Sequence, residues 1–121
     1  MSVERLPGER SAAQVAESVR QSGAQPHVVN GTTVRTKGEA MDAIATALSF
    51  PDYFGRNLDA LYDCLTDLSW LGEGEHVLVW DRPDLLAAHD PKAYAAVYAV
   101  LADAVATQPV GRRLRVLLVS P

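Results

Sequence analysis

Three short apolar runs, separated by segments long enough to form helices, constrain the fold of this chain most. They are HVV at 27–29, HVLVW at 76–80 and LRVLLVS at 114–120. The second run is almost continuously apolar, which is typical of a strand buried on both faces of a sheet. Parallel strands need long crossover connections, usually helices. The sequence therefore predicts an α/β fold in which a small three-stranded parallel sheet is flanked by helices.

Capping residues mark where the intervening helices begin. Thr36 and Glu39 form a T-x-x-E capping pattern. Asn57 can cap a further helix, and Asp90 followed by Pro91 is a typical start for a long one. The predicted helices cover about residues 12–22, 37–50, 58–68, 84–89 and 91–107.

The length and composition favour a single globular domain. The chain has 121 residues, of which 48% are hydrophobic and 21% are charged. We expect residues 1–26 to be an N-terminal extension with an extra helix, and residues 27–121 to form the main domain. No secretory signal or long apolar segment is apparent, and Cys64 is the single cysteine. These features predict a protein of the reducing cytoplasm.

The charge is unevenly distributed along the chain. Residues 42–90 carry ten acids and two bases, a net charge of −8, whereas the remainder carries five acids and nine bases, a net charge of +4. An acidic middle segment would repel nucleic acid and attract a basic protein. A solvated acidic face without a partner is the alternative interpretation.

The predicted helix from residue 58 has an apolar side and an acidic side. On a helical wheel the apolar side gathers Leu58, Leu61, Cys64, Leu65 and Leu68. The opposite side carries Asp59 and Asp63 one turn apart, flanked by Tyr62 and Asp67. Asp59 can interact with the helix dipole, but Asp63 has no such compensation, and residues 57–75 contain no base. Helix stability would not select this face, so it indicates a positively charged partner.

Aromatic residues accompany these acids. Tyr53 and Phe54 precede the helix, Tyr62 lies on it and Trp70 follows it. Aromatic side chains beside charged ones are typical of the central residues of protein interfaces. Burial in the core is the alternative for Phe54 and Trp70.

The stretch PDYFGRNLDALYDCL at 51–65 resembles the signature of the barstar family of ribonuclease inhibitors. The pattern is a proline, an aromatic pair, a glycine and an N-L-D-A-L-aromatic-D-C-L helix. The similarity extends more loosely from Asn30-Gly31 through the strand ending in Trp80 to the last strand. It implies a barstar-like inhibitor domain at 27–121, in which three parallel strands are flanked by helices.

The resemblance also implies a function, which is to plug the active site of a small, basic, secreted ribonuclease of the guanyl-specific, barnase-like type. By position, Asp63 resembles the acid that enters the phosphate-binding pocket of the nuclease, and Asp59 its acidic neighbour. The expected partner-binding residues are Tyr53, Gly55, Asn57, Leu58, Asp59, Tyr62, Asp63, Asp67 and Trp70. Asp103 is a candidate for a further acidic contact. The implied protein is a monomer when free, binds no cofactor, nucleic acid or membrane, and acts as an immunity protein.

This chain departs from the family pattern at three places. Arg56 stands where an acid is usual, Tyr62 replaces tryptophan, and Asp67-Leu68 replaces a glycine and a tryptophan. Arg56 could repel a cationic enzyme, or it could pair with an acid on a divergent partner. These departures leave the identity of the target open.

Other functions remain as alternatives. The first is a regulatory domain that keeps the fold and binds a protein other than a nuclease. An RNA-binding module would use the arginines at 112–115, which is a weak signal in an acidic chain. An enzyme using Cys64 or the paired acids is disfavoured, because the thiol falls on the apolar side. His27, His76 and His89 lack metal-ligand spacing and are expected at the surface or at strand ends.

Overall fold

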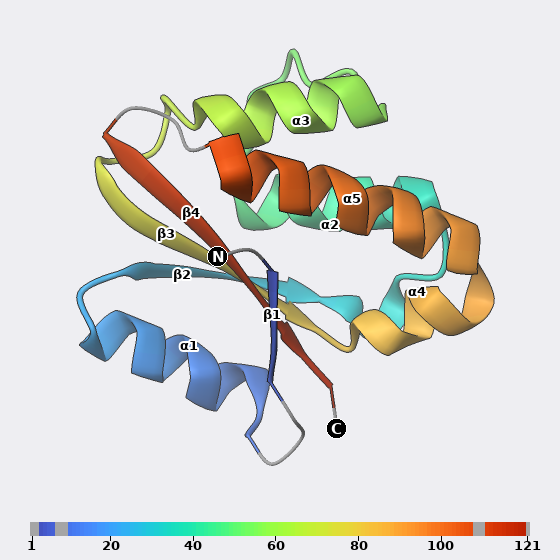
Figure 1. Ribbon diagram of the computed structural model, residues 1–121, viewed down its shortest axis with the longest axis horizontal. Helices are drawn as coiled ribbons and strands as arrows, with labels where there is room; N and C mark the ends of the chain where they lie inside the picture. The colour runs from blue at the N-terminus through green and yellow to red at the C-terminus, as the bar shows by residue number, and fades with distance from the viewer. Residues whose placement is uncertain (1–2, 7–9, 108–110, 121) are drawn as a thin grey trace.

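The computed structural model describes residues 3–6, 10–107 and 111–120, and over these ranges four parallel strands form one sheet in the order β1-β4-β3-β2 (Figure 1). The strands are β1 (Val3–Leu6), β2 (Gln25–Asn30), β3 (Gly74–Asp81) and β4 (Arg112–Val119). The α-helices are α1 (Ala12–Gln21), α2 (Lys37–Ala47), α3 (Leu58–Asp67), α4 (Pro83–His89) and α5 (Pro91–Thr107). A short 3₁₀ turn, η1 (Gly31–Thr33), follows β2.

The predicted α/β class and parallel sheet are confirmed, but the predicted number of three strands is wrong. The missed strand is β1, which pairs with the outer edge of β4. Its sequence, VERL, has two charged residues between two apolar ones and carries little strand signal of its own. Its pairing with β4 is a tertiary effect that local propensity does not encode.

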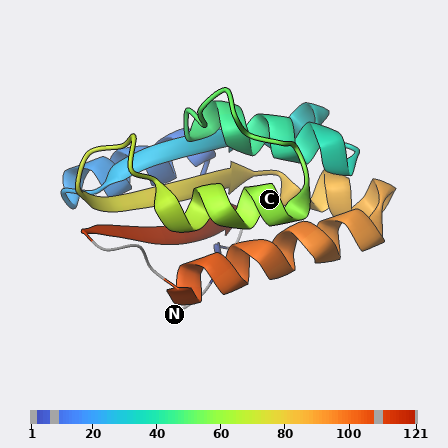
Figure 2. The ribbon, with the colours of Figure 1, turned by 90° about the horizontal axis from the view of Figure 1, so that it is seen from above.

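The helices cover the two faces of the sheet unequally. Helices α2, α3, α4 and α5 pack on one face, and α1 packs on the other (Figures 1 and 2). The larger core lies on the four-helix face and includes Trp80, which is 1% exposed as predicted for a central strand. The smaller core joins α1 to β3 and β4 through Val15, Val77 and Leu117. No helix in the described ranges has the length and apolar character required to cross a bilayer.

Side-chain caps begin the helices where the sequence predicts them. The Thr36 hydroxyl accepts from the Glu39 amide at 3.1 Å, and Asn57 Oδ1 accepts from the Ala60 amide at 2.8 Å. Asp90 Oδ1 accepts from the Ala93 amide at 3.1 Å. Each cap satisfies a backbone N–H that has no partner within its helix.

Two histidines connect the sheet to the chain segments around it. His27 Nδ1 lies 3.2 Å from the Ala47 carbonyl oxygen, and His76 Nε2 lies 2.6 Å from the Gly72 carbonyl oxygen. His27 Nε2 and His76 Nδ1 lie 3.0 Å apart. His76, the third residue of β3, is fully buried, so a location at the surface is wrong for this histidine. Burial first, and then the nearby His76, lower the pKa of His27 below its ordinary value.

The lowered pKa of His27 predicts a pH-dependent contribution to stability. His27 resists protonation in the folded protein, whereas in the unfolded chain it takes up a proton near pH 6.5. The stability that neutral His27 contributes is therefore lost as the pH falls. The difference in free energy of unfolding between the wild type and His27→Gln should therefore shrink between about pH 7.5 and 5.5. Chemical denaturation at several pH values measures it. A difference that grows on acidification would contradict the prediction.

Candidate protein-binding surface

Helix α3 packs against α5 on the four-helix face of the sheet (Figures 1 and 2). Leu61 and Leu65 are fully buried and Cys64 is 4% exposed, which confirms the predicted apolar side. Leu58, in the first turn, is only partly buried and packs at the margin of the core. The leucines therefore fix which side of α3 faces the solvent.

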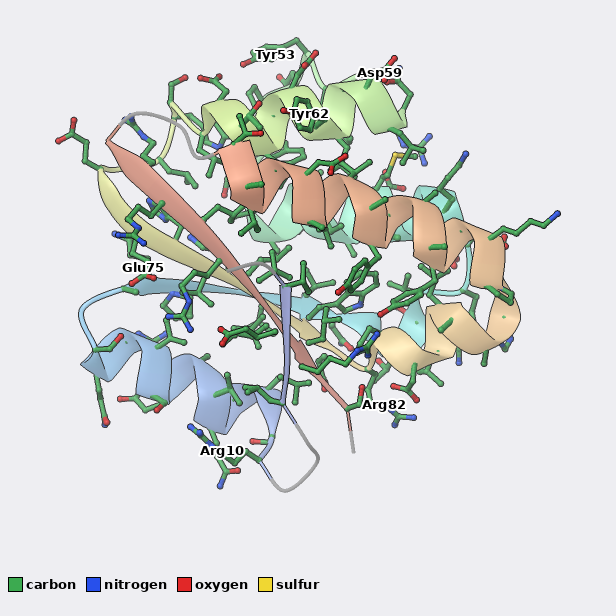
Figure 3. The ribbon with its side chains drawn as sticks, viewed as in Figure 1. Arg10, Tyr53, Asp59, Tyr62, Glu75 and Arg82 are labelled. Carbon is green, nitrogen blue, oxygen red and sulfur yellow. The ribbon has the colours of Figure 1, made fainter. Side chains whose placement is uncertain are left out.

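The solvent side of α3 presents three carboxylates. Asp59, Asp63 and Asp67 are all exposed, and Figure 3 shows Asp59 and Tyr62 on the outward part of the helix. Within the described ranges, no ion pair involves Asp59 or Asp63, whereas Asp67 accepts a hydrogen bond from Ser69 at 3.1 Å. The two acids at the centre of this side are thus available to an external cation.

A groove between α3 and α5 adds a third helix-borne acid to this pair. It has a volume of ≈ 520 Å³ and is named the acidic groove below. Its lining residues are Leu58, Asp59, Tyr62, Asp63, Val100 and Asp103. The Tyr62 hydroxyl and Thr107 Oγ1 are 2.9 Å apart and link the two helices across it. An apolar floor with three carboxylates suits a cationic side chain that has an aliphatic stem, such as arginine.

The aromatic loop, residues 51–57, leads into α3 beside this groove. Tyr53 is 72% exposed and projects from the loop (Figure 3). Phe54 is half-buried, with its ring centroid 5.0 Å from that of Phe50 in an edge-to-face arrangement. The loop therefore has one aromatic anchor in the core and one aromatic side chain offered to the solvent.

Trp70 lies half-buried in the segment after α3. Its indole N–H donates to the Leu48 carbonyl at 2.9 Å, and its ring centroid is 5.8 Å from that of Phe50. Leu68, in a left-handed conformation with φ of 52°, ends α3 and turns the chain towards Trp70. The indole thus ties the end of α3 to the end of α2, and only part of its surface remains accessible.

A scan against known families identifies the chain. The model described as "Barstar (barnase inhibitor)" matches residues 24–119. The chain belongs to the barstar family. It is also 68% identical over 25 residues to the Bacillus subtilis (strain 168) protein named "Putative ribonuclease inhibitor YrdF". That alignment spans 21% of this chain and 28% of the relative.

The barstar-family match spans the acidic groove and the aromatic loop, and it leaves β1 and all of α1 outside. The predicted contact residues Tyr53, Gly55, Asn57, Leu58, Asp59, Tyr62 and Asp63 lie together on α3 and the loop before it. Asp67 and Trp70 lie at the far end of α3, away from the groove lining. Asp103 is brought to Asp59 and Asp63 by the packing of α5 on α3.

Sequence reasoning missed the partner of Arg56. The guanidinium of this residue forms a bidentate ion pair with Asp42 of α2, in which Nε to Oδ1 is 2.7 Å and Nη2 to Oδ2 is 3.0 Å. Asp42 raises the pKa of Arg56 through that hydrogen bond. The two residues are 14 apart in sequence and belong to different elements, so no local pattern predicts the contact.

The remaining reactive side chain of α3 is not poised for catalysis. Burial first, and then Asp67 and Asp63, raise the pKa of the Cys64 thiol above its ordinary value. The thiol therefore stays protonated at neutral pH, and the thiolate is the nucleophilic form. Asp63 and Asp67 thus disfavour the thiolate form of Cys64 that a nucleophile would need.

The two sides of α3 predict opposite effects of substitution on stability. Leu65→Ala removes a fully buried side chain and should reduce the free energy of unfolding by about 2–5 kcal/mol. Asp63→Ala should leave stability unchanged or raise it slightly, because it relieves repulsion between like charges one turn apart. Urea denaturation of both variants is the measurement. A comparable loss in Asp63→Ala would show that this carboxylate has a structural role.

Proposed function

We propose that this protein inhibits a small, basic, secreted ribonuclease of the guanyl-specific, barnase-like type by occluding its active site. The observation that carries the proposal is the acidic groove. It gathers Asp59, Asp63 and Asp103, and no ion pair among the described residues neutralises these three acids. These carboxylates therefore remain available to the basic side chains of a cationic cleft.

The chemistry of an RNA-cleaving site explains why carboxylates would serve. Such a site binds the substrate phosphate with cationic side chains, and a carboxylate can take the place of phosphate oxygens in charge-assisted hydrogen bonds. Asp63, at the middle of the solvent side of α3, is the acid proposed to enter the phosphate-binding pocket. Asp59 and Asp103 would pair with basic side chains of the nuclease at the edge of that pocket.

The aromatic loop and the rest of α3 would complete the interface. Tyr53 supplies an exposed ring, and Gly55 supplies a backbone without a side chain. Tyr62 lines the groove with its aromatic side chain. The proposed partner-binding set is Tyr53, Gly55, Asn57, Leu58, Asp59, Tyr62, Asp63, Asp67 and Trp70, with Asp103 added. Asp67 and Trp70 would lie at the rim of the contact.

The proposal extends to the setting in which the protein acts. The inhibitor domain would be residues 27–121, with residues 1–26 as an N-terminal extension. The protein would act as a monomer in the cytoplasm, without a cofactor and without catalysis of its own. There it would protect the cell that makes the nuclease before the nuclease is secreted.

Removing the central charge tests the proposal. Asp63→Asn keeps the shape of the side chain but removes its charge. It should weaken binding to barnase by about 2–5 kcal/mol, partly because basic side chains of the nuclease lose their partner. The matched control is Glu17→Gln on α1, an exposed acid on the opposite face of the sheet. This control should bind like the wild type. Titration calorimetry and inhibition of RNA cleavage provide the two readouts.

The panel of enzymes should include other small basic ribonucleases beside barnase. Inhibition by the wild type that is lost in Asp63→Asn and kept in Glu17→Gln would support the proposal. If the wild type inhibits none of these enzymes, the proposal fails in favour of a regulatory domain with a non-nuclease partner.

The charge distribution predicts that association depends on salt. The segment 42–90 has a net charge of −8 and would steer a basic enzyme by electrostatic attraction. At physiological ionic strength, salt screens this attraction beyond about 8 Å. The association rate should fall as the salt concentration rises, while the dissociation rate changes little. Stopped-flow mixing measures both rates. An association rate that does not change with salt would contradict electrostatic steering.

A further inference from the structure

The ion pair between Arg56 and Asp42 joins the aromatic loop to α2. Arg56 is the residue before Asn57, the N-cap of α3, and follows Gly55. Asp42 lies in the middle of α2. The contact is bidentate, which fixes the plane of the guanidinium as well as its distance from the carboxylate.

The surface of α2 is shaped to receive this guanidinium. A side-chain carbon built at Gly38 would lie 3.3 Å from Arg56 Nη2, so the absence of a side chain leaves room for the group. Gly38 and Asp42 are four residues apart and share one face of the helix. Arg56 itself has a left-handed backbone, with φ of 54°, which is unfavourable for a residue other than glycine. A strained backbone persists where surrounding contacts hold it.

We infer that Asp42 is a positioning residue for the partner-binding surface, acting through Arg56. Asp42 holds the end of the aromatic loop on α2 and offsets the positive charge of Arg56, which comes two residues before Leu58 of the acidic groove. The inference rests on the proposed function for its partner, a cationic ribonuclease. Arg56 then neither repels a cationic enzyme nor pairs with an acid on the partner, the two roles considered from the sequence. Its role is to anchor the aromatic loop within the chain.

The loop has two anchors. Phe54, in the middle of the loop, packs on Phe50, and Arg56, near the end of the loop, binds Asp42. Tyr53 projects from the loop with 72% of its surface exposed. Releasing Arg56 would free the segment next to Gly55 and the N-cap, and would place an uncompensated cation near the groove. The first effect acts on dissociation of the complex and the second on association.

Three variants separate these effects: Asp42→Asn, Arg56→Gln and the double variant. Each single variant should dissociate from barnase about two- to fivefold faster, the range expected for an exposed ion pair. Association should slow in Asp42→Asn, because Arg56 becomes uncompensated, and should quicken in Arg56→Gln. The double variant should dissociate no faster than either single variant, because the same anchor is lost in all three. Surface plasmon resonance measures both rates.

The control is Glu17→Gln, which breaks an exposed ion pair of the same shortest distance within α1, 2.7 Å between Arg20 Nη1 and Glu17 Oε1. It should leave both rates unchanged. Unchanged dissociation in both single variants, or an additive effect in the double variant, would overturn the positioning role.

A second measurement needs no partner and separates failure of the anchor from failure of the proposed function. The Phe54 amide donates to the Pro51 carbonyl at 3.1 Å, so its hydrogen exchange reports order in the aromatic loop. Exchange in the free protein should be faster in Asp42→Asn and in Arg56→Gln, and unchanged in Glu17→Gln. Unchanged exchange in all variants would overturn the anchor. Faster exchange in a protein that inhibits no ribonuclease would support the anchor and overturn the proposed function.

Discussion

The burial of one side of α3 is the constraint on which the rest of the surface depends. Leu61 and Leu65 are fully buried, and this packing fixes the rotation of the helix about its axis. The carboxylates at positions 59 and 63 then have to face the solvent, at the place where α5 supplies Asp103. Hydrophobic burial therefore sets the direction of the charges, and no ion pair among the described residues engages them. A surface of this kind can change its acids in evolution without changing its fold.

Local patterns in the sequence were sufficient for the elements that bury apolar residues periodically. The strands β2, β3 and β4, the leucine side of α3 and the caps Thr36, Asn57 and Asp90 all follow from such patterns. The features that were missed depend on contacts between distant segments. β1 has a weak pattern and owes its conformation to β4, and the burial of His76 reflects its contacts with the Gly72 carbonyl and with His27 of β2.

The candidate site shows the same division. Asp59, Asp63 and Tyr53 could be chosen from spacing and from a family signature, because they lie on one continuous segment. The proximity of Asp103 required the packing of α5 on α3, and the pairing of Arg56 with Asp42 required the aromatic loop to lie on α2. A positive charge seen in sequence as a departure from the family is, in the structure, half of an internal ion pair. Its charge is paired with that of Asp42, a residue that lies outside the signature.

The strand β1 has a consequence for the behaviour of the whole sheet in solution. It covers Val116–Val119, the most apolar part of β4, which would otherwise be an open edge with unpaired backbone donors and acceptors. Such edges recruit strands from other molecules and begin aggregation. At the opposite edge, Pro26 of β2 removes one backbone donor. A short, charged strand thus ends the growth of the sheet on one side, and a proline interrupts it on the other.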